Sequence, residues 1–433
     1  MRRGKHGEAF KFLVKARRED GLEGEAQTRL EWELGRCWVK LGYIENAIES
    51  YENALPDSHE DALYPWQAGA YEELAALYET GEEALRCCRN AARLRERFEL
   101  PEDENTVSLF RNIADMLWDD GEEDEARVWY NKEMAVRDRL LPEEVDALGK
   151  QLIEQGKALM ENKQYEQAVK EFTKALDILV PFIGMLHSRV IAILNNLAEV
   201  YTQIALQHIQ NDIAEYHRFM FLTVDCFEKA LEAKNRLFHD CMSTAHTHRN
   251  LGEALDRCSS LDISTIGEVN GLVVSVKEND RAILVRAIPH LKVALQIIHK
   301  NADENMVMIA DTRRKLGNVF CGLGNYEEAI AELREACSYY QKAQVDSELA
   351  LTYSFLANTY LKMQNYTEGL NWYFMAWQLL GKLEFSGMAD HVFDRIKRTY
   401  RETAQARERQ KPFEEWLREK QAEADAHGGA EAG

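Results

Sequence analysis

The sequence contains little proline and no long apolar run. Seven prolines and 24 glycines in 433 residues leave room for long helices and little for the many turns of a sandwich of strands. No apolar run approaches the roughly 20 residues that a membrane-spanning helix needs, so we expect no membrane insertion. Hydrophobic residues make up 45% of the chain, which is enough for a core and excludes wholesale disorder.

Basic residues are also in deficit, because 53 of them face 74 acidic residues and the net charge is -21. An acidic chain repels phosphates, which excludes general nucleic-acid binding. The charge is unevenly placed. Residues 1–18 hold seven basic residues and one acidic residue, whereas residues 19–388 carry a net charge of -26. This acidic body favours a protein partner that offers a basic or mixed-charge segment.

Two features predict a cytoplasmic protein. The segment MRRGKHGEAFKFLVKARRED has basic residues scattered among its apolar ones, so it lacks the apolar core of a secretion signal, although a mitochondrial presequence stays an alternative. The eight cysteines show no C-x-x-C pairing and no dense framework, which predicts reduced thiols. They are Cys37, Cys87, Cys88, Cys226, Cys241, Cys258, Cys321 and Cys337.

Self-comparison shows that the chain is a repeat. EWELGRCWVKLGYIENAIESYENAL, which starts at Glu31, has the same spacing of Leu-Gly, aromatic, Gly, Ala, bulky and Ala positions as TRRKLGNVFCGLGNYEEAIAELREA, which starts at Thr312. This spacing places one apolar stripe on each of two helices, and the small residue lets the second helix approach the first. The sequence strongly resembles the tetratricopeptide-repeat family, whose helical hairpins stack because none can cover its own apolar stripe.

The paired residues of the first helix recur along most of the chain at steps of about 40 residues. We therefore predict an all-α fold, an α-solenoid wound as a right-handed superhelix from about eight tetratricopeptide-like hairpins and a terminal capping helix. Pro101, Pro142 and Pro181 fall between repeats, where a helix must stop. The pairs are Leu34-Gly35, Leu74-Ala75, Ile113-Ala114, Gln155-Gly156, Leu197-Ala198, Leu251-Gly252, Leu316-Gly317 and Leu356-Ala357.

The repeat register predicts the organisation of the whole chain. Residues 1–18 fit a lone second helix, so the chain starts mid-repeat as a fragment or with an N-terminal cap. The array spans 19–385, with insertions near 203–225, where we expect prolonged helices, and near 256–286, where we expect a loop that holds a short hairpin in LVVSV. Pro289 predicts that the next helix starts near it. We expect a charged capping helix over 386–424, kinked or divided at Pro412, and a disordered tail over 425–433.

Polar residues beside the first-helix pairs predict a peptide-binding groove on the concave face. Asn112, Asn196 and Asn250 precede their pairs, and an Asn amide both donates and accepts hydrogen bonds, so it can hold a peptide backbone. The acidic positions are one turn further on, and the neighbouring arginines offer these acids an alternative partner. The further candidates are Asp115, Glu199, Glu253, Arg111, Asn195, Arg249, Arg314, Asn318 and Asn358.

The phrase LNNLAEVY closely resembles the repeats of kinesin light chain and of the Pins-type polarity adaptors. That resemblance implies that Asn112, Asn196 and Asn250 hold an extended peptide. The pattern is incomplete, because the corresponding positions of other repeats are Glu154, Lys315 and Phe355. The asparagines could instead bind neighbouring helices or water. Arg314 and Asn318 echo the carboxylate clamp of chaperone-binding repeats, but Ser354 and Phe355 do not continue it, so we do not predict that function.

No sequence motif indicates catalysis or a cofactor. The phosphate-binding glycine loops, G-x-S-x-G and H-E-x-x-H are all missing. The one dense group of potential metal ligands is FHDCMSTAHTHRN, which lacks a two-plus-two ligand spacing. We therefore predict a non-enzymatic protein that uses no cofactor. The residues of this group are His239, Asp240, Cys241, His246 and His248.

Three function classes remain open at this point. The first is an adaptor or scaffold that binds an extended or helical segment of a partner protein in its concave groove. The second is a structural subunit of a large cytoskeletal assembly, because long-period repeats of this kind resemble those of axonemal and dynein-docking proteins. The third is a metal-dependent enzyme built around the His/Cys group. The location follows the function: cytoplasm for the first class, cytoskeleton or ciliary axoneme for the second.

Overall fold

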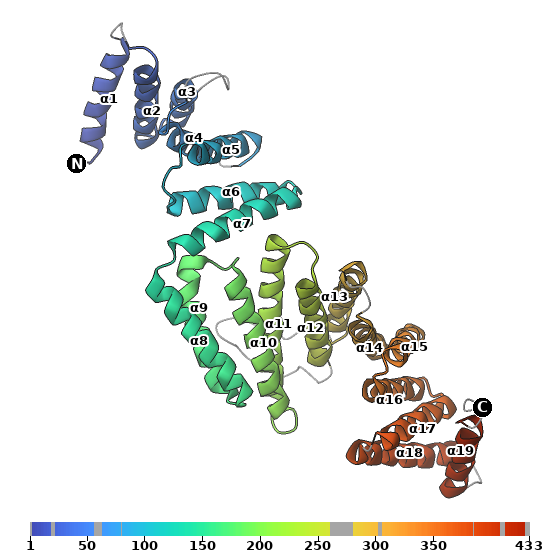
Figure 1. Ribbon diagram of the computed structural model, residues 1–433. Helices are drawn as coiled ribbons and strands as arrows, with labels where there is room; N and C mark the ends of the chain where they lie inside the picture. The colour runs from blue at the N-terminus through green and yellow to red at the C-terminus, as the bar shows by residue number, and fades with distance from the viewer. Residues whose placement is uncertain are drawn as a thin grey trace. The chain divides into compact units, whose positions relative to one another are not determined.

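The computed structural model describes residues 2–18, 22–55, 63–78, 80–259, 280–301, 305–383, 385–407 and 412–428. Within these ranges the chain forms 19 helices and no strand (Figure 1). Consecutive helices pack as antiparallel hairpins, so the prediction of an all-α solenoid of about eight hairpins is confirmed.

Helix α1 (Arg2–Arg18) precedes the eight hairpins and packs on α2. Helices α18 (Ser386–Arg407) and α19 (Phe413–Gly428) follow them. The hairpins are α2 (Glu25–Leu41) with α3 (Ile44–Ala54), α4 (Gln67–Tyr78) with α5 (Glu82–Arg97), α6 (Glu104–Asp119) with α7 (Glu123–Leu140), α8 (Glu143–Glu161) with α9 (Tyr165–Ile183), α10 (Ser188–His208) with α11 (Ile213–Leu237), α12 (Met242–Ser259) with α13 (Asp280–Asn301), α14 (Met306–Leu323) with α15 (Tyr326–Lys342), and α16 (Asp346–Lys362) with α17 (Tyr366–Lys382).

The small residue of each pair sets how closely the two helices of a hairpin approach. A Cβ atom added to Gly317 of α14 would lie 2.7 Å from Cγ of Leu333 and 3.1 Å from the carbonyl oxygen of Ala329, both on α15. Gly156 meets Phe172 in the same way, with 2.6 Å between an added Cβ and the ring. A side chain larger than hydrogen at these positions would force the hairpin apart.

The described residues form two compact units that share parts of three helices. Unit 1 consists of residues 1–162, 170–193 and 232–239, and unit 2 consists of residues 163–169, 194–231 and 240–433. The last turns of α11 therefore belong to unit 1, while the rest of that helix belongs to unit 2.

Two prolines lie inside helices rather than at the predicted boundaries. Helix α9 continues past Pro181 to Ile183, and α13 begins at Asp280 rather than near Pro289. Both predictions were wrong for the same reason. Each proline is exposed, so the carbonyl that loses its helical partner can bind water. Helices α10 and α11, with 21 and 25 residues, span most of the first insertion. Residues 260–279 of the second insertion, with LVVSV, lie outside the described residues.

The C-terminal segment forms two helices separated at Pro412, and α19 runs to Gly428, beyond the predicted helix end. The prediction of a tail from 425 was therefore wrong for residues 425–428, and residues 429–433 lie outside the described residues. The two helices do more than present charge. Trp416 of α19 lies 5.3 Å from Tyr400 of α18 and 6.3 Å from Phe374 of α17 between ring centroids, so an aromatic cluster joins them to the last hairpin.

One helix among the described residues, Arg281–Asn301 within α13, is long and apolar enough by length and composition to cross a membrane, with a mean hydropathy of 1.3. Core helices of soluble proteins pass the same test. Ile283, Ala287 and Leu291 of α13 are buried, and Leu291 packs against Gly252 of α12. Charged and polar residues interrupt these apolar positions, which is why the sequence shows no continuous apolar run.

We predict that Gly317→Ala lowers the free energy of unfolding by about 1–2 kcal/mol. The added methyl group meets a backbone carbonyl that cannot move freely, and this cost exceeds the gain in helix propensity of about 1 kcal/mol. The matched control is Gly381→Ala in α17, where an added Cβ has no neighbour within 4 Å. We expect the control to be neutral or stabilising in thermal unfolding followed by circular dichroism. Equal losses in both variants would contradict the packing argument.

Candidate groove site

Unit 1 contains an open pocket of about 380 Å³ between the first helices α4 and α6, with α5 at its base. Two predicted groove residues, Asn112 and Asp115 of α6, both line it. First helices were predicted to form the groove, and this pocket lies between two of them. Its lining residues are Glu72, Ala75, Ala76, Thr80, Ala84, Cys88, Asn105, Ser108, Leu109, Asn112, Asp115, Met116 and Asp119.

The acidic side chains that line the pocket differ in whether a basic side chain of the protein binds them. Glu72 accepts a hydrogen bond from Nε of Arg95 at 2.6 Å and is neutralised by it. Asp119 and Asn112 are exposed, and neither has a side-chain hydrogen bond to another residue in the described part of the chain. The pocket therefore presents an unpaired carboxylate and an unpaired amide on one face of α6, about two helical turns apart.

Asp115 is not free, because it anchors a polar cluster with Tyr130 of α7 and Arg236 of α11. The Tyr130 hydroxyl donates to Oδ1 of Asp115 at 2.5 Å, and Nη1 of Arg236 donates to the same oxygen at 3.2 Å. Burial raises the pKa of the Tyr130 phenol, and its hydrogen bond to Asp115 raises it further, so the hydroxyl stays protonated and acts as a donor.

Arg111 does not pair with Asp115, although the spacing of the two residues in the sequence allowed that pair. Its Nε and Nη2 donate to the two carboxylate oxygens of Glu133 at 2.8 Å each, and Arg137 donates to Glu133 at 2.7 Å. The carboxylate of Glu133, on the second helix α7, is only 2% exposed. This buried charge binds the Arg111 side chain in place of a groove ligand. Arg111 thus holds α6 to α7, and its role in peptide binding stays a prediction.

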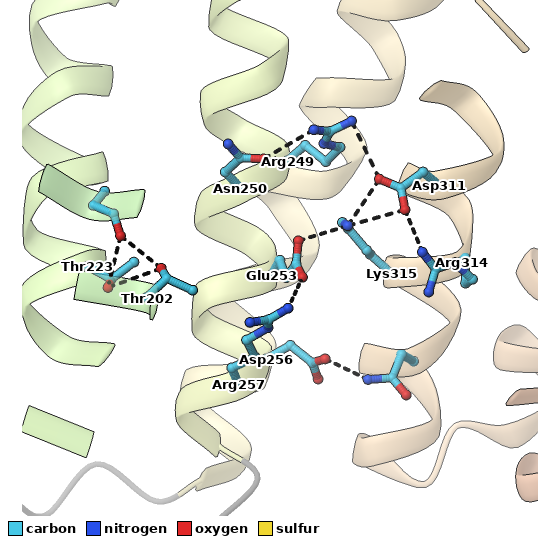
Figure 2. Close-up of polar contacts among 12 residues, drawn as sticks. Thr202, Thr223, Arg249, Asn250, Glu253, Asp256, Arg257, Asp311, Arg314 and Lys315 are labelled. Carbon is cyan, nitrogen blue, oxygen red and sulfur yellow. Dashed lines mark hydrogen bonds and ion pairs between the residues drawn. The ribbon is translucent and has the colours of Figure 1, made fainter. Parts of the chain in front are cut away.

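In unit 2, residues predicted separately for two repeats form one charge network between the first helices α12 and α14 (Figure 2). Nζ of Lys315 lies 2.8 Å from Oε2 of Glu253 and 3.0 Å from Oδ2 of Asp311. Arg257 donates to Glu253 at 2.6 Å, so this acid is neutralised within the protein. Glu253 is therefore no free acidic group for a basic ligand.

The two predicted arginines of this region bind Asp311 from opposite sides. Nη1 of Arg249 lies 3.4 Å from Oδ2 of Asp311, and Nη2 of Arg314 donates to Oδ1 at 2.7 Å. The suggested pairing of Arg249 with Glu253 was wrong, because Asp311 of the next repeat is its acidic partner. Arg249 also donates to the side-chain oxygen of Asn250 at 3.3 Å, so this asparagine is engaged inside its own helix.

Asn318 binds the carboxylate of Asp256, which lies on α12 close to the same network. Its Nδ2 donates to Oδ2 of Asp256 at 2.6 Å. Burial raises the pKa of Asp256 to about 6, and the nearby Glu253 raises it too, although the Asn318 hydrogen bond opposes both effects. Asn318 therefore links α14 to α12, and its side-chain amide is already bound within the protein.

The remaining predicted residues lie on two other first helices. Asn195 and Asn196 are half-buried on α10, and Glu199 is exposed on the same helix. Asn196 and Glu199 have no side-chain hydrogen bond to another residue within the described ranges. Asn358 on α16 accepts from the Tyr373 hydroxyl at 2.5 Å and from Arg395 at 3.3 Å. Asn358 thus has the same role as Asp115, because each accepts from the tyrosine of its own second helix and from a distant arginine.

Sequence reasoning missed the residues of α7 that contact a distant segment. Nε of Arg127 donates to the carbonyl oxygen of Asn235 at 3.1 Å, and Nδ2 of Asn131 donates to that of Leu237 at 2.9 Å. These residues stand on a second helix, where no groove position was expected. Asn131 and Leu237 are 106 residues apart in the chain, so no local sequence pattern predicts their contact.

The His/Cys group does not assemble as a ligand set. Among the described residues no group of three or more His, Cys, Asp or Glu side chains could hold a metal ion. His239 is exposed and lies 3.5 Å from Asp124, while His248 faces His290 of α13 at 3.0 Å between their Nδ1 atoms. Cys87 and Cys88 are both buried, and burial raises the pKa of their thiols to about 11 and about 12, which keeps them protonated.

Comparison with known proteins identifies the repeats. A family model described as tetratricopeptide repeat matches residues 309–343, which hold most of α14 and all of α15. A second model with the same description matches residues 152–178, in α8 and α9. The chain contains tetratricopeptide repeats. Repeats of this family bind other proteins, so the chain is in general terms an interaction scaffold. No curated protein matches the chain by sequence.

Solved structures with similar folds include three of different origin. BtubC (BKLC) from P. vanneervenii has 17% identity and a TM-score of 0.37, with 60% of this chain and 91% of that chain covered. A kinesin-light-chain-like protein from P. anserina with nearly identical tetratricopeptide-like repeats has 12% identity and a TM-score of 0.26, with 75% of this chain and 100% of that chain covered. A Rap protein complexed with competence and sporulation factor has 11% identity and a TM-score of 0.34, with 88% and 99% covered.

We predict that Asp256→Asn stabilises the protein at neutral pH and that this effect is lost as the pH falls from about 6 to about 4. A carboxyl whose pKa is raised on folding binds a proton more tightly in the native state, so the stability falls as the pH rises from about 4 through about 6. The amide oxygen of the variant can still accept from Asn318. The check is the difference in Tm between variant and wild type as a function of pH. Asp177→Asn on the exposed face of α9 is the control, and a pH-independent difference at Asp256 would contradict the prediction.

Proposed function

We propose that this tetratricopeptide-repeat protein is a non-enzymatic adaptor that binds an extended, basic segment of a partner protein along α6. The observation that carries the proposal is the pocket between α4 and α6, where Asn112 and Asp119 are exposed and unpaired, about two turns apart on one face of α6. The amide of Asn112 can donate to a peptide carbonyl and accept from a peptide N–H. The carboxylate of Asp119 can accept from a lysine or arginine side chain.

The charge of the pocket indicates which kind of partner segment it can bind. Glu72 is paired with Arg95, and Asp115 is paired with Tyr130 and Arg236, so Asp119 supplies the net negative charge at the surface. In unit 2 the acids near α12 are neutralised by four basic side chains and offer no comparable attraction. The basic ligand predicted from the sequence is therefore assigned to α6 and not to α12.

We keep the role of a structural subunit in a cytoskeletal or axonemal assembly as the alternative proposal. It differs from the adaptor in the surface it uses, because a built-in subunit would bind through its outer face and not through the pocket. The buried thiols agree with a reducing compartment such as the cytoplasm, which suits both roles.

The test uses wild type and a double variant, Asn112→Ala with Asp119→Asn, against an array of basic and acidic peptides matched in length. We expect the basic peptides to bind wild type, to weaken with added salt, and to lose at least about tenfold in affinity in the variant, because a charge-assisted hydrogen bond is worth about 1.5–3 kcal/mol. The measurement is fluorescence anisotropy.

The matched control is Asn90→Ala with Glu82→Gln, which makes the same kind of changes on α5 outside the pocket lining. This control should bind as wild type does. Equal binding of acidic and basic peptides, or equal affinity in all three proteins, would contradict the proposed function.

A further inference from the structure

The last turn of α11 is held against α6 and α7 by contacts between residues far apart in the sequence. Nη1 of Arg236 donates to Oδ1 of Asp115 at 3.2 Å and to the Tyr130 hydroxyl oxygen at 3.0 Å. Its guanidinium carbon lies 5.7 Å from the ring centroid of Trp118 and 5.8 Å from that of Tyr130. An arginine is thus bound by a carboxylate, a hydroxyl and two aromatic faces, a set that suits a guanidinium better than an ammonium.

The backbone on either side of Arg236 is bound as well. Arg127 donates to the carbonyl oxygen of Asn235 and Asn131 donates to that of Leu237, at 3.1 and 2.9 Å. The side-chain contacts and these two hydrogen bonds together recognise one arginine and the two peptide carbonyls that flank it. This is a tripeptide pattern that does not depend on the side chains next to the arginine.

The groups that make these contacts are fixed by the protein before anything binds. Arg127 is oriented by Glu123 at 2.6 Å and by Asp124 at 2.8 Å, two consecutive residues on the first turn of α7. Nδ2 of Asn131 also donates to the carbonyl oxygen of Arg127 at 2.8 Å. Tyr130 is only 1% exposed, so its ring cannot turn away. Such preorganisation lowers the entropic cost of binding.

The contact between Arg236 and Asp115 is accessible from solvent, so another cation can take the place of Arg236. The side chains of Arg236 and Asp115 are 28% and 44% exposed, so water and other cations reach the pair. Asp115 lines the pocket on α6 as well, which makes the arginine contact continuous with the proposed binding surface. A segment that lies in the pocket can therefore reach Asp115 with its next basic side chain.

We propose that Asp115, Trp118, Arg127, Tyr130 and Asn131 form an arginine-binding subsite of the groove, that Arg236 of α11 occupies it within the chain, and that an arginine-bearing partner segment competes with it. The proposal rests on the proposed function, because the partner segment reaches the subsite from the pocket. The internal segment is present at an effective concentration of the order of millimolar, so it weakens every external ligand that uses the same groups. Partner binding then releases the last turn of α11.

The test uses a fluorescein-labelled peptide with the sequence KALEAKNRLFHD, which is residues 229–240 of the chain. Full-length Arg236→Gln should bind this peptide at least about tenfold more tightly than wild type, because its internal segment no longer competes. The peptide with glutamine in place of its arginine should not bind. Adding Asp115→Asn to Arg236→Gln should remove the gain, which separates the subsite from general attraction between the basic peptide and the acidic chain.

A second measurement does not depend on the folding of a variant. Excess unlabelled peptide should speed hydrogen exchange of the amides of residues 232–239 in wild type, because those residues leave the subsite, while exchange at the buried core of α4 should stay constant. A folded Arg236→Gln variant that binds the peptide no better than wild type would overturn the proposal, and so would unchanged exchange in wild type.

Failure of this proposal can be told apart from failure of the proposed function. Arrayed basic peptides that bind wild type and Arg236→Gln equally, but lose affinity in Asn112→Ala with Asp119→Asn, would leave the groove function standing and remove the internal competitor. An array that binds no form of the protein, together with a gain for KALEAKNRLFHD in Arg236→Gln, would leave only a structural contact of α11 and remove the groove function.

Discussion

The close approach of two helices at a small residue is the constraint on which the rest of the structure depends. A glycine or alanine after the first-helix leucine lets a bulky residue of the second helix lie directly against the backbone, as Leu333 does at Gly317 and Phe172 does at Gly156. Each hairpin then exposes an apolar edge that its neighbour covers, and the first helices follow one another. Side chains that flank the small residue consequently face the adjacent first helix, where they bind it or bind a ligand.

Most of these flanking side chains bind the protein itself. Between α12 and α14 the two acids Glu253 and Asp311 are matched by arginines and by Lys315, so the polar surface is satisfied within the chain (Figure 2). On α6 the balance differs, because Asn112 and Asp119 have no such partner in the described part of the chain. Unsatisfied polar groups on a preformed concave surface are what a binding site needs, since the ligand supplies the missing partners. The same reasoning separates Asp119 from Asp115, which Arg236 already occupies.

The sequence predicted the fold well and the site only in part. The spacing of Leu-Gly pairs is a local property, so the hairpins followed from it, whereas exposed prolines such as Pro181 and Pro289 did not stop their helices because water can satisfy the freed carbonyls. The pairing of groove residues depends on contacts between repeats, which periodicity cannot supply. Arg111 bound a buried glutamate on α7, and Arg236 reached Asp115 across 121 residues. Asn112 and Asp115 both line a pocket, and the use of these residues and of Asn196 in peptide binding stays a prediction.

The central claim is that the α6 surface receives a partner segment. The most direct measurement places a photo-reactive cross-linking residue at position 112, in the pocket, and in a second protein at position 128, an exposed valine on α7 outside the pocket lining. Each protein is irradiated with a purified binding partner, and the linked peptide is sequenced by mass spectrometry. We expect position 112 to link to a segment that carries an arginine and position 128 to form no such link. Linkage from position 128 alone, or to an acidic segment at position 112, would contradict it.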